Sequence, residues 1–163
     1  MNNLQHLFRL LFFVSLLLLS SRLFADVKTV EDLGVLKQQA EASNLPILLM
    51  FAAEECEFCD VVRDNYLLPM IKSGDYKSKT LIRQVYIEDY SYLRNAKGEL
   101  ISGDVLAYKY NIDVTPTILF LSSSGQELVE RIIGISNIHY FGEALDKHIA
   151  IANAALAKNT PRK

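Results

Sequence analysis

Two cysteines that lie three positions apart are the residues of this chain best suited to chemistry. Cys56 and Cys59 enclose Glu57 and Phe58, and they are the only cysteines among the 163 residues. A buried strand is predicted just before this C-x-x-C motif, and a helix is predicted to begin at it. Because the N–H groups and dipole of a helix start favour negative charge, a thiolate at Cys56 is stabilised there as a nucleophile. Cys59 is placed to attack a mixed disulfide on Cys56 and release the substrate.

Three other uses of the cysteine pair stay open at this point. A structural disulfide in so short a loop removes little chain entropy, so it stabilises a fold poorly. A zinc or copper site needs more ligands than two thiolates, and beyond residue 25 the chain adds only His139 and His148. Haem attachment needs a histidine after the second cysteine, where Asp60 stands. The motif therefore favours thiol–disulfide exchange, and we predict neither a metal nor a cofactor.

A second motif, Val114-Thr115-Pro116-Thr117, lies just before a predicted strand. Proline cannot donate a hydrogen bond to a sheet and is usually found at sheet edges or strand starts, so a plain strand-start proline is one interpretation. The other is a cis-proline loop packed against the two cysteines. We favour the second because the C-x-x-C motif lies upstream on the expected element.

The elements that position these residues are predicted in the order helix, strand, helix, strand, helix, strand, strand, helix. Apolar residues at helical spacing and capping residues indicate the helices, with Thr29 capping the first and Ser136 capping the last. Short continuous apolar runs indicate the strands, of which PILLMFAA is the clearest. The predicted helices span 30–44, 56–71, 104–110 and 138–156, and the predicted strands span 46–53, 81–87, 117–121 and 127–133.

These elements assemble into an α/β fold with a small mixed β-sheet flanked by helices on both faces. A right-handed βαβ connection makes the first two strands parallel, and the later hairpin adds antiparallel strands. Pro69 is expected to kink the second helix or end its regular part. Residues 89–103 are polar and are predicted to be irregular, with a turn at Lys97-Gly98. No Gly-rich phosphate loop opens a helix, so nucleotide binding is not predicted.

Composition excludes several classes of function. Hydrophobic residues make up 50% and charged residues 22% of the chain, which is typical of globular proteins and excludes a disordered chain. The net charge of −2 gives no electrostatic basis for binding nucleic acid. Two cysteines exclude a framework of several disulfides.

The first 25 residues have the order of a secretory signal peptide. One basic residue, Arg9, precedes the nearly unbroken apolar run 10–19, and a short segment ends at Ala25, after which cleavage is expected. An uncleaved anchor is the alternative, but the stretch between Arg9 and Arg22 has 12 residues, whereas a spanning helix needs about 20. We therefore predict a signal peptide at 1–25 and an exported, periplasmic mature domain at 26–163 that does not span the membrane. Disulfides form and persist in that compartment.

Three segments in this order and spacing resemble the thioredoxin superfamily. They are LLMFAAEECEFC at 48–59, YNIDVTPTILF at 110–120, and the hairpin from Gly125 to Gly134. The resemblance covers about residues 30–150 and is nearest to exported thioredoxin-like proteins of the SoxW or thioredoxin-like 2 group.

This resemblance implies a thioredoxin fold and assigns roles to the motif residues. Cys56 is the attacking cysteine, Cys59 is the resolving cysteine and Pro116 is the cis-proline. Thr115 offers backbone groups to an extended substrate segment. Phe58, expected to be exposed beside the sulfurs, completes the predicted substrate-binding residues.

The chain departs from ordinary thioredoxins around the motif. Met50 stands where thioredoxins carry a buried acid, Glu55 replaces a tryptophan, and Glu57-Phe58 replaces Gly-Pro. The two glutamates are expected to raise the pKa of Cys56 because they oppose its thiolate. Plain solvated surface charge is the alternative. Since strong oxidants stabilise their reduced thiolate, the acids favour a reductant.

The leading hypothesis is an exported thiol–disulfide oxidoreductase that reduces disulfides of protein substrates. A reductase outside the cytoplasm needs electrons, which implies a thiol-reducing membrane protein as its donor. A non-catalytic binding or chaperone module and a thiolate metal carrier are the alternatives.

The remaining aromatic and imidazole side chains give weaker signals. We expect the tyrosines of the middle segment to pack a loop against the sheet rather than to form a recognition surface. His139 and His148 are expected to face solvent on or near the last helix. The tyrosines concerned are Tyr86, Tyr90, Tyr92, Tyr108 and Tyr110.

Overall fold

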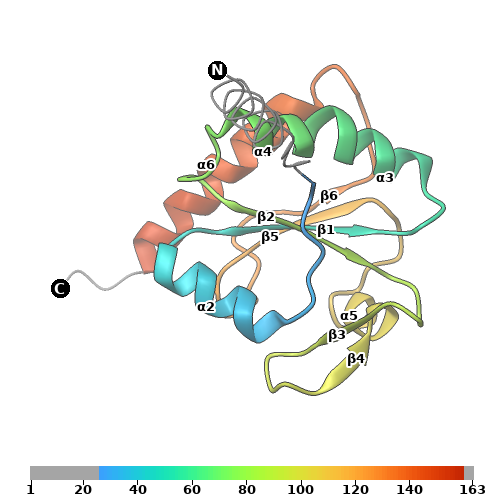
Figure 1. The fold of residues 1–163 in the computed structure, drawn as a ribbon. Coiled ribbons are helices and arrows are strands. Elements are labelled where there is room, and N and C mark those ends of the chain that lie inside the picture. The colour runs from blue at the N-terminus through green and yellow to red at the C-terminus, as the bar shows by residue number, and fades with distance from the viewer. Residues whose placement is uncertain (1–25, 160–163) are drawn as a thin grey trace, which may run out of the picture.

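The computed structural model describes residues 26–159, and the predicted signal peptide lies outside this range. Its central sheet contains four strands in the order β2-β1-β5-β6. Strand β1 (Ile47–Ala52) pairs in parallel with β2 (Leu81–Tyr86) and antiparallel with β5 (Thr117–Leu121), which pairs antiparallel with β6 (Ile132–Ile133). The predicted mixed sheet is therefore confirmed (Figure 1).

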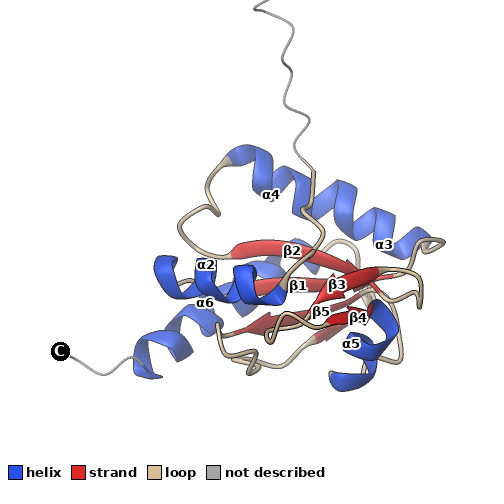
Figure 2. Cartoon of the chain, turned by 60° about the horizontal axis from the view of Figure 1, so that its bottom comes forward, coloured by secondary structure: helices blue, strands red, loops and turns tan. Residues whose placement is uncertain are grey.

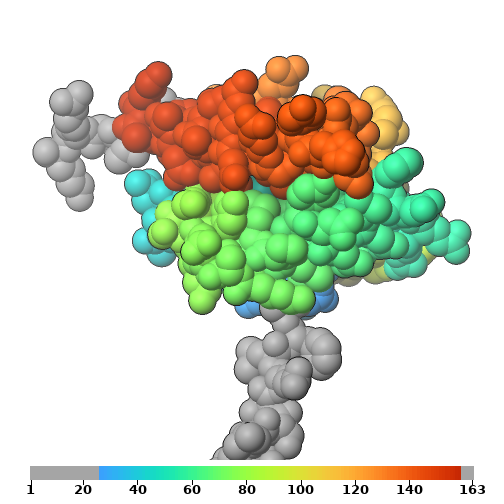
Figure 3. Space-filling model, turned by 90° about the horizontal axis from the view of Figure 1, so that it is seen from above, coloured from blue at the N-terminus to red at the C-terminus, as the bar shows by residue number. Residues whose placement is uncertain are grey.

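Helices cover both faces of this sheet, as the sequence predicts. Helices α3 (Glu57–Val62), α4 (Leu68–Ser73) and α6 (Phe141–Asn159) lie on one face, and α2 (Leu33–Ser43) and α5 (Gly103–Lys109) lie on the other (Figures 1 and 2). Figure 3 shows α6, in orange and red, side by side with the green α3–α4 segment. The rings of Tyr66, which lies between α3 and α4, and Phe141 of α6 pack together with centroids 4.9 Å apart.

Strand β1 divides the core into two apolar layers. All six of its residues are buried because the strand lies in the middle of a sheet that is covered on both sides. Leu48, Met50 and Ala52 pack towards α3, α4 and α6. The alternate residues, Ile47, Leu49 and Phe51, pack towards α2 and α5. This central strand provides a rigid base for the C-x-x-C motif that follows it.

Helix α2 begins three residues later than predicted. Asp32, not Thr29, is its N-cap, and the Asp32 side chain accepts hydrogen bonds from the N–H groups of Gly34 and Val35. Thr29 instead pairs with Gln84 as an isolated bridge beside β2, because this part of the chain is extended. The predicted stop at Asn44 is confirmed, since Asn44 is the C-cap in the left-handed region.

The helix that begins at the cysteines accommodates Pro69 through a change of helical type. Helix α3 continues into a π-helical turn, η1 (Arg63–Leu67), and then into α4, with Pro69 in the first turn of α4. A proline lacks the N–H that an α-helix interior requires, but a first turn does not need it. The wider turn before Pro69 thus ends the regular part of the helix, as predicted, while the segment runs on to Ser73.

The segment predicted to be irregular, 89–103, contains a second small sheet. Strands β3 (Tyr92–Arg94) and β4 (Leu100–Ser102) pair antiparallel, and the predicted turn at Lys97-Gly98 joins them. Leu93 is buried in the layer shared with α2 and α5. Strands of three residues are too short to display an alternating pattern, which is why the sequence prediction was wrong here.

Two predicted boundaries near the C-terminal end are also wrong. The strand expected at 127–133 shrinks to β6 plus an isolated bridge between Leu121 and Glu127. Arg131 explains the interruption, because its guanidinium pairs with Glu127 and donates to the backbone oxygen of Tyr110. Helix α6 begins at Phe141, so Ser136 is not its cap.

None of the helices within residues 26–159 combines the length and apolar character needed to cross a bilayer.

Candidate functional site

The two cysteines form a disulfide at the start of α3. Cys56 is the N-cap residue of α3, and its Sγ accepts a hydrogen bond from the backbone N–H of Cys59 at 3.2 Å. The S–S distance is 2.09 Å and the Cα–Cα distance is 5.2 Å. Residues 53–55 connect the pair directly to buried β1. The site thus has the predicted arrangement of strand, cysteine pair and helix.

The two sulfurs differ in their access to solvent. Cys59 is fully buried, at 0% exposure, and belongs to the apolar layer that contains Val62 and Met50. Cys56 is half-buried at the rim of the same layer. A partner molecule can therefore reach Cys56 but not Cys59, which matches an attacking role for the first and a resolving role for the second.

The segment 114–117, which we call the proline loop, contacts Cys56. The hydroxyl of Thr115 donates to Cys56 Sγ at 3.5 Å, and the Thr115–Pro116 peptide bond is cis. Pro116 is buried, and its carbonyl accepts a hydrogen bond from Gly134 at 2.8 Å. The backbone N–H and C=O of Thr115 have no hydrogen bond within residues 26–159. These two groups remain free for an extended peptide beside the disulfide.

The residues in which this chain differs from ordinary thioredoxins around the motif are buried or exposed according to their polarity, except for Phe58. Met50 is fully buried in β1, so an apolar side chain occupies the position below the cysteines. Phe58 is 62% exposed on the first turn of α3. Glu55 and Glu57 are exposed on either side of Cys56.

Sequence reasoning missed Glu88 as part of this region. The carboxylate of Glu88 accepts a hydrogen bond from the backbone N–H of Glu54 through Oε1 at 2.8 Å. Its second oxygen, Oε2, is buried and has no hydrogen-bond partner among the described residues. Strands β1 and β2 are parallel, so the residues that follow them meet at the same end of the sheet. An acidic residue soon after β2 was the signal that could have located this contact.

Tyr90, just before the β3–β4 hairpin, also reaches residues 53–55, which precede Cys56 and which we call the cysteine loop. The hydroxyl of Tyr90 donates to Glu54 Oε2 at 3.0 Å. This hydrogen bond, with the nearby charges of Glu88 and Asp89, raises the pKa of Tyr90 above its ordinary value. Gly103 holds the end of the hairpin close to β2, since a Cβ at this position would lie 1.8 Å from the backbone oxygen of Tyr86.

The aromatic residues of the middle segment are more exposed than expected. Tyr90, Tyr92 and Tyr108 are 59%, 64% and 86% exposed, which corrects the expectation that they pack against the sheet. Each lies in a hairpin or short helix whose other side faces the core, so its own side faces solvent. Tyr86 and Tyr110 do pack against the core layers.

The two histidines lie far from the cysteines in the sequence and differ from each other. His148 stacks on Phe120, with ring centroids 5.4 Å apart, so it is not solvent-facing as predicted. His139 is exposed in the turn before α6. Among residues 26–159, no group of three or more histidine, cysteine or acidic side chains is placed to hold a metal ion.

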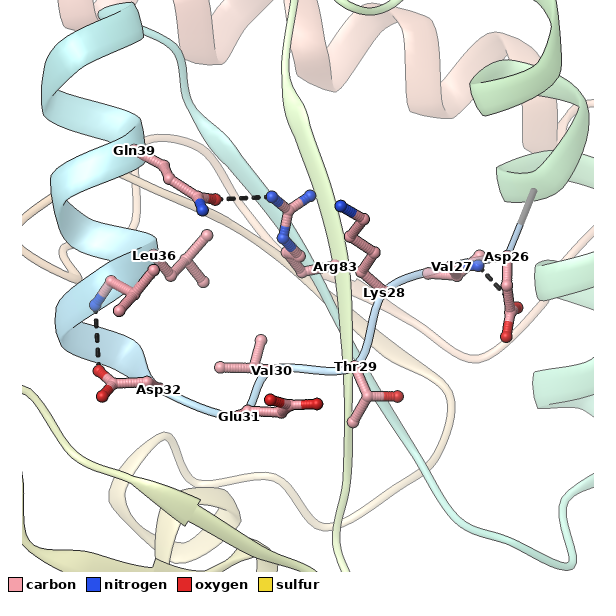
Figure 4. A pocket seen from close by; sticks show the side chains of 11 residues that line it. Asp26, Val27, Lys28, Thr29, Val30, Glu31, Asp32, Leu36, Gln39 and Arg83 are labelled. Carbon is pink, nitrogen blue, oxygen red and sulfur yellow. Dashed lines mark hydrogen bonds between the residues drawn. The ribbon is translucent and has the colours of Figure 1, made fainter. Parts of the chain in front are cut away.

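A pocket of about 560 Å³ lies away from this region, between α2 and the segment 26–32 (Figure 4). Its lining includes Arg83, which donates to Gln39. Neither cysteine and no residue of the proline loop lines it. The pocket is therefore not part of the disulfide site.

Comparison with known proteins identifies the family. The sequence-family model of the thioredoxin-like domain matches residues 35–149, which is more than half of the chain. The chain belongs to the thioredoxin-like family. This thioredoxin-like domain carries a cysteine pair at disulfide distance, and the combination supports thiol–disulfide oxidoreductase activity.

Solved structures share the fold of this thioredoxin-like domain. A poplar thioredoxin h is 19% identical with a TM-score of 0.52, and the match covers 76% of this chain and 96% of that one. Mitochondrial thioredoxin 3 from Saccharomyces cerevisiae, in its oxidized form, is 17% identical with a TM-score of 0.51, covering 76% and 93%. At these identities the likeness concerns the fold. A comparison with curated proteins found no match.

Proposed function

We propose that this thioredoxin-like protein is an exported oxidoreductase that reduces disulfides in protein substrates. The observation that carries the proposal is the asymmetric cysteine pair: Cys56 half-exposed at the N-terminus of α3, and Cys59 buried behind it. In the reduced protein, the Cys56 thiolate attacks a substrate disulfide. A Cys56–substrate S–S bond forms, the substrate S–S bond breaks, and one substrate sulfur leaves as a thiolate.

Cys59 completes the reaction. Its thiol loses a proton and attacks Cys56 Sγ, which forms the intramolecular disulfide and expels the second substrate sulfur. Two electrons and two protons pass in total from the Cys56–Cys59 dithiol to the substrate. The N–H of Cys59 and the hydroxyl of Thr115 both donate to Cys56 Sγ, and these donors favour the thiolate that begins and ends the cycle.

The reductive direction is favoured by the charges around Cys56. Glu55 and Glu57 are exposed acids next to it, and they oppose the thiolate whose stabilisation makes a strong oxidant. Regeneration then requires a dithiol donor, and for an exported protein we propose a thiol-reducing membrane protein. Export itself is supported by the charge and apolar pattern of residues 1–25.

The reduction potential of the Cys56–Cys59 couple tests the direction. Residues 26–163 would be equilibrated in glutathione or dithiothreitol buffers, and the dithiol fraction would be read by alkylation and mass spectrometry. We expect a value near roughly −270 mV or lower, as for thioredoxin. A value near about −120 mV would instead identify a disulfide donor.

A further inference from the structure

The surface around Cys56 carries five carboxylates that form no ion pair within residues 26–159. Three come from the cysteine loop and the first turn of α3, and two follow β2: Glu54, Glu55, Glu57, Glu88 and Asp89. None of the three ion pairs found within residues 26–159 includes any of them. Negative charge is therefore concentrated, without internal neutralisation, beside the one sulfur that a partner can reach.

Hydrogen bonds fix part of this charge in place. Glu88 accepts from the N–H of Glu54, and Glu54 accepts from the hydroxyl of Tyr90. The second oxygen of Glu88 is buried and accepts nothing from residues 26–159. Glu54 and Glu88 are thus held at defined positions close to Cys56 in the chain.

Exposed aromatic rings accompany the carboxylates. Phe58 and Tyr90 are 62% and 59% exposed, although large aromatic side chains are typical of buried cores and interfaces. The faces of such rings attract ammonium and guanidinium groups. Aromatic rings and carboxylates therefore favour the same kind of partner side chain, lysine or arginine.

We propose that this surface docks a lysine- or arginine-rich segment of the protein whose disulfide is exchanged. We call it the acidic surface: the five carboxylates together with Phe58 and Tyr90. The inference rests on the proposed thiol–disulfide exchange, and it adds a substrate class, namely proteins with cationic residues beside the reacting cysteine. A protein segment is the occupant because the surface is continuous with Cys56, through Glu55 and Glu57 on either side of it.

The acidic surface has two effects on exchange with such a partner. Before contact, opposite charges raise the rate of encounter, and this effect weakens as salt screens it. After contact, the partner's cations offset Glu55 and Glu57, so the thiolate of Cys56 is less strongly opposed. The acidic surface therefore slows the reaction of the dithiol with anionic disulfides and speeds its reaction with cationic ones.

Matched disulfide peptides test this inference. Three peptides of the same length, each with one disulfide, would carry lysine, glutamate or glutamine beside the cysteines, and their reduction by the reduced protein would be followed by mass spectrometry. At an ionic strength of about 0.01 M we expect the lysine peptide to react at least roughly tenfold faster than the glutamate peptide. At about 1 M, where the screening length falls to roughly 3 Å, the ratio should approach one.

Two double variants, each of which removes two negative charges, test whether the charge selection arises at the acidic surface. Glu55→Gln with Glu57→Gln should reduce the lysine-to-glutamate rate ratio severalfold. Using a ratio removes the change that these substitutions cause in the reactivity of Cys56 itself. Glu41→Gln with Asp75→Asn removes two exposed acids at the ends of α2 and α4, and should leave the ratio unchanged.

The outcomes separate the inference from the proposed function. Failure to reduce any of the three peptides, including the glutamine peptide, would overturn the proposed function itself. Equal rates for all three would overturn only the charge selection. A ratio that survives high salt, or that responds equally to both double variants, would also overturn docking at the acidic surface.

Discussion

Cys56 lies between two surfaces of opposite character. On one side the proline loop presents Val114 and Thr115, neither of which is charged, and the backbone groups of Thr115 that have no hydrogen bond within residues 26–159. On the other side the acidic surface presents carboxylates and exposed rings. Backbone hydrogen bonds accept many sequences, whereas side-chain charge discriminates between them. The difference separates two tasks: the proline loop aligns a peptide, and the acidic surface selects which peptide arrives.

Removal of Cys56 Sγ, which lies between the two surfaces, should have the largest effect on disulfide reduction. Cys56→Ser should abolish reduction of every disulfide, whatever its charge, because no other thiol is exposed within the described residues. Cys59→Ser should instead accumulate a mixed disulfide on Cys56, visible as an added mass that dithiothreitol removes. Efficient turnover by Cys56→Ser would mean that neither surface acts through this sulfur.

Substitution of Gly103 should destabilise the protein where the hairpin approaches β2, on the side of the acidic surface. Gly103→Ala places a Cβ 1.8 Å from the backbone oxygen of Tyr86, so we expect a loss of about 1–3 kcal/mol or more in the free energy of unfolding, measured in urea. Gly142→Ala is the control, since its Cβ would meet only the ring of Tyr66 at 3.7 Å. In a helix it should be neutral or stabilising by up to about 1 kcal/mol. Similar losses for both variants would refute the close approach at Gly103.

The two surfaces should shift the pKa of Cys56 in opposite directions. Thr115→Val removes a hydroxyl that donates to the sulfur, so the pKa should rise. A hydrogen bond of this kind is worth about 0.5–1.5 kcal/mol, and the variant thiolate loses that stabilisation. The thiolate absorbance of the reduced protein, titrated against pH, measures the rise in pKa. A lower pKa in this variant would contradict the hydrogen bond.

Glu57→Gln should lower the same pKa by a smaller amount. An exposed carboxylate opposes the thiolate weakly, so a small decrease in the pKa of Cys56, diminishing with added salt, is expected. A lower pKa leaves more thiolate at acidic pH, and exchange there should be faster. Asp75→Asn serves as the control at a distant exposed site, and an equal shift in that variant would show a general rather than local effect.

The smallest expected change concerns Tyr90. Its hydrogen bond to Glu54 raises its pKa, so Glu54→Gln should return the pKa towards the ordinary value of a tyrosine. Tyrosinate absorbance at alkaline pH would report the shift, with Tyr90→Phe used to identify the signal. No change would mean that the Tyr90–Glu54 hydrogen bond does not form in solution.

The sequence predicted the proline loop better than the acidic surface, for physical reasons. The apolar run of β1, the cysteine spacing and Pro116 are local signals, and each corresponds directly to an element. The contacts of Glu88 and Tyr90 arise only when β1 and β2 align in parallel and the hairpin folds back. Three-residue strands leave no periodic signal, so β3 and β4 could not be recognised from hydrophobicity alone.

Burial of Cys59 also determines how the protein withstands chemical damage. Peroxides and alkylating agents attack exposed thiolates, so in the dithiol state they meet Cys56 and not Cys59. A sulfenic acid formed on Cys56 has an intact thiol three residues away, and condensation with it restores the disulfide before irreversible oxidation follows. Cys59 can thus also reverse the oxidation of Cys56, because burial in the core protects its own thiol from the same reagents.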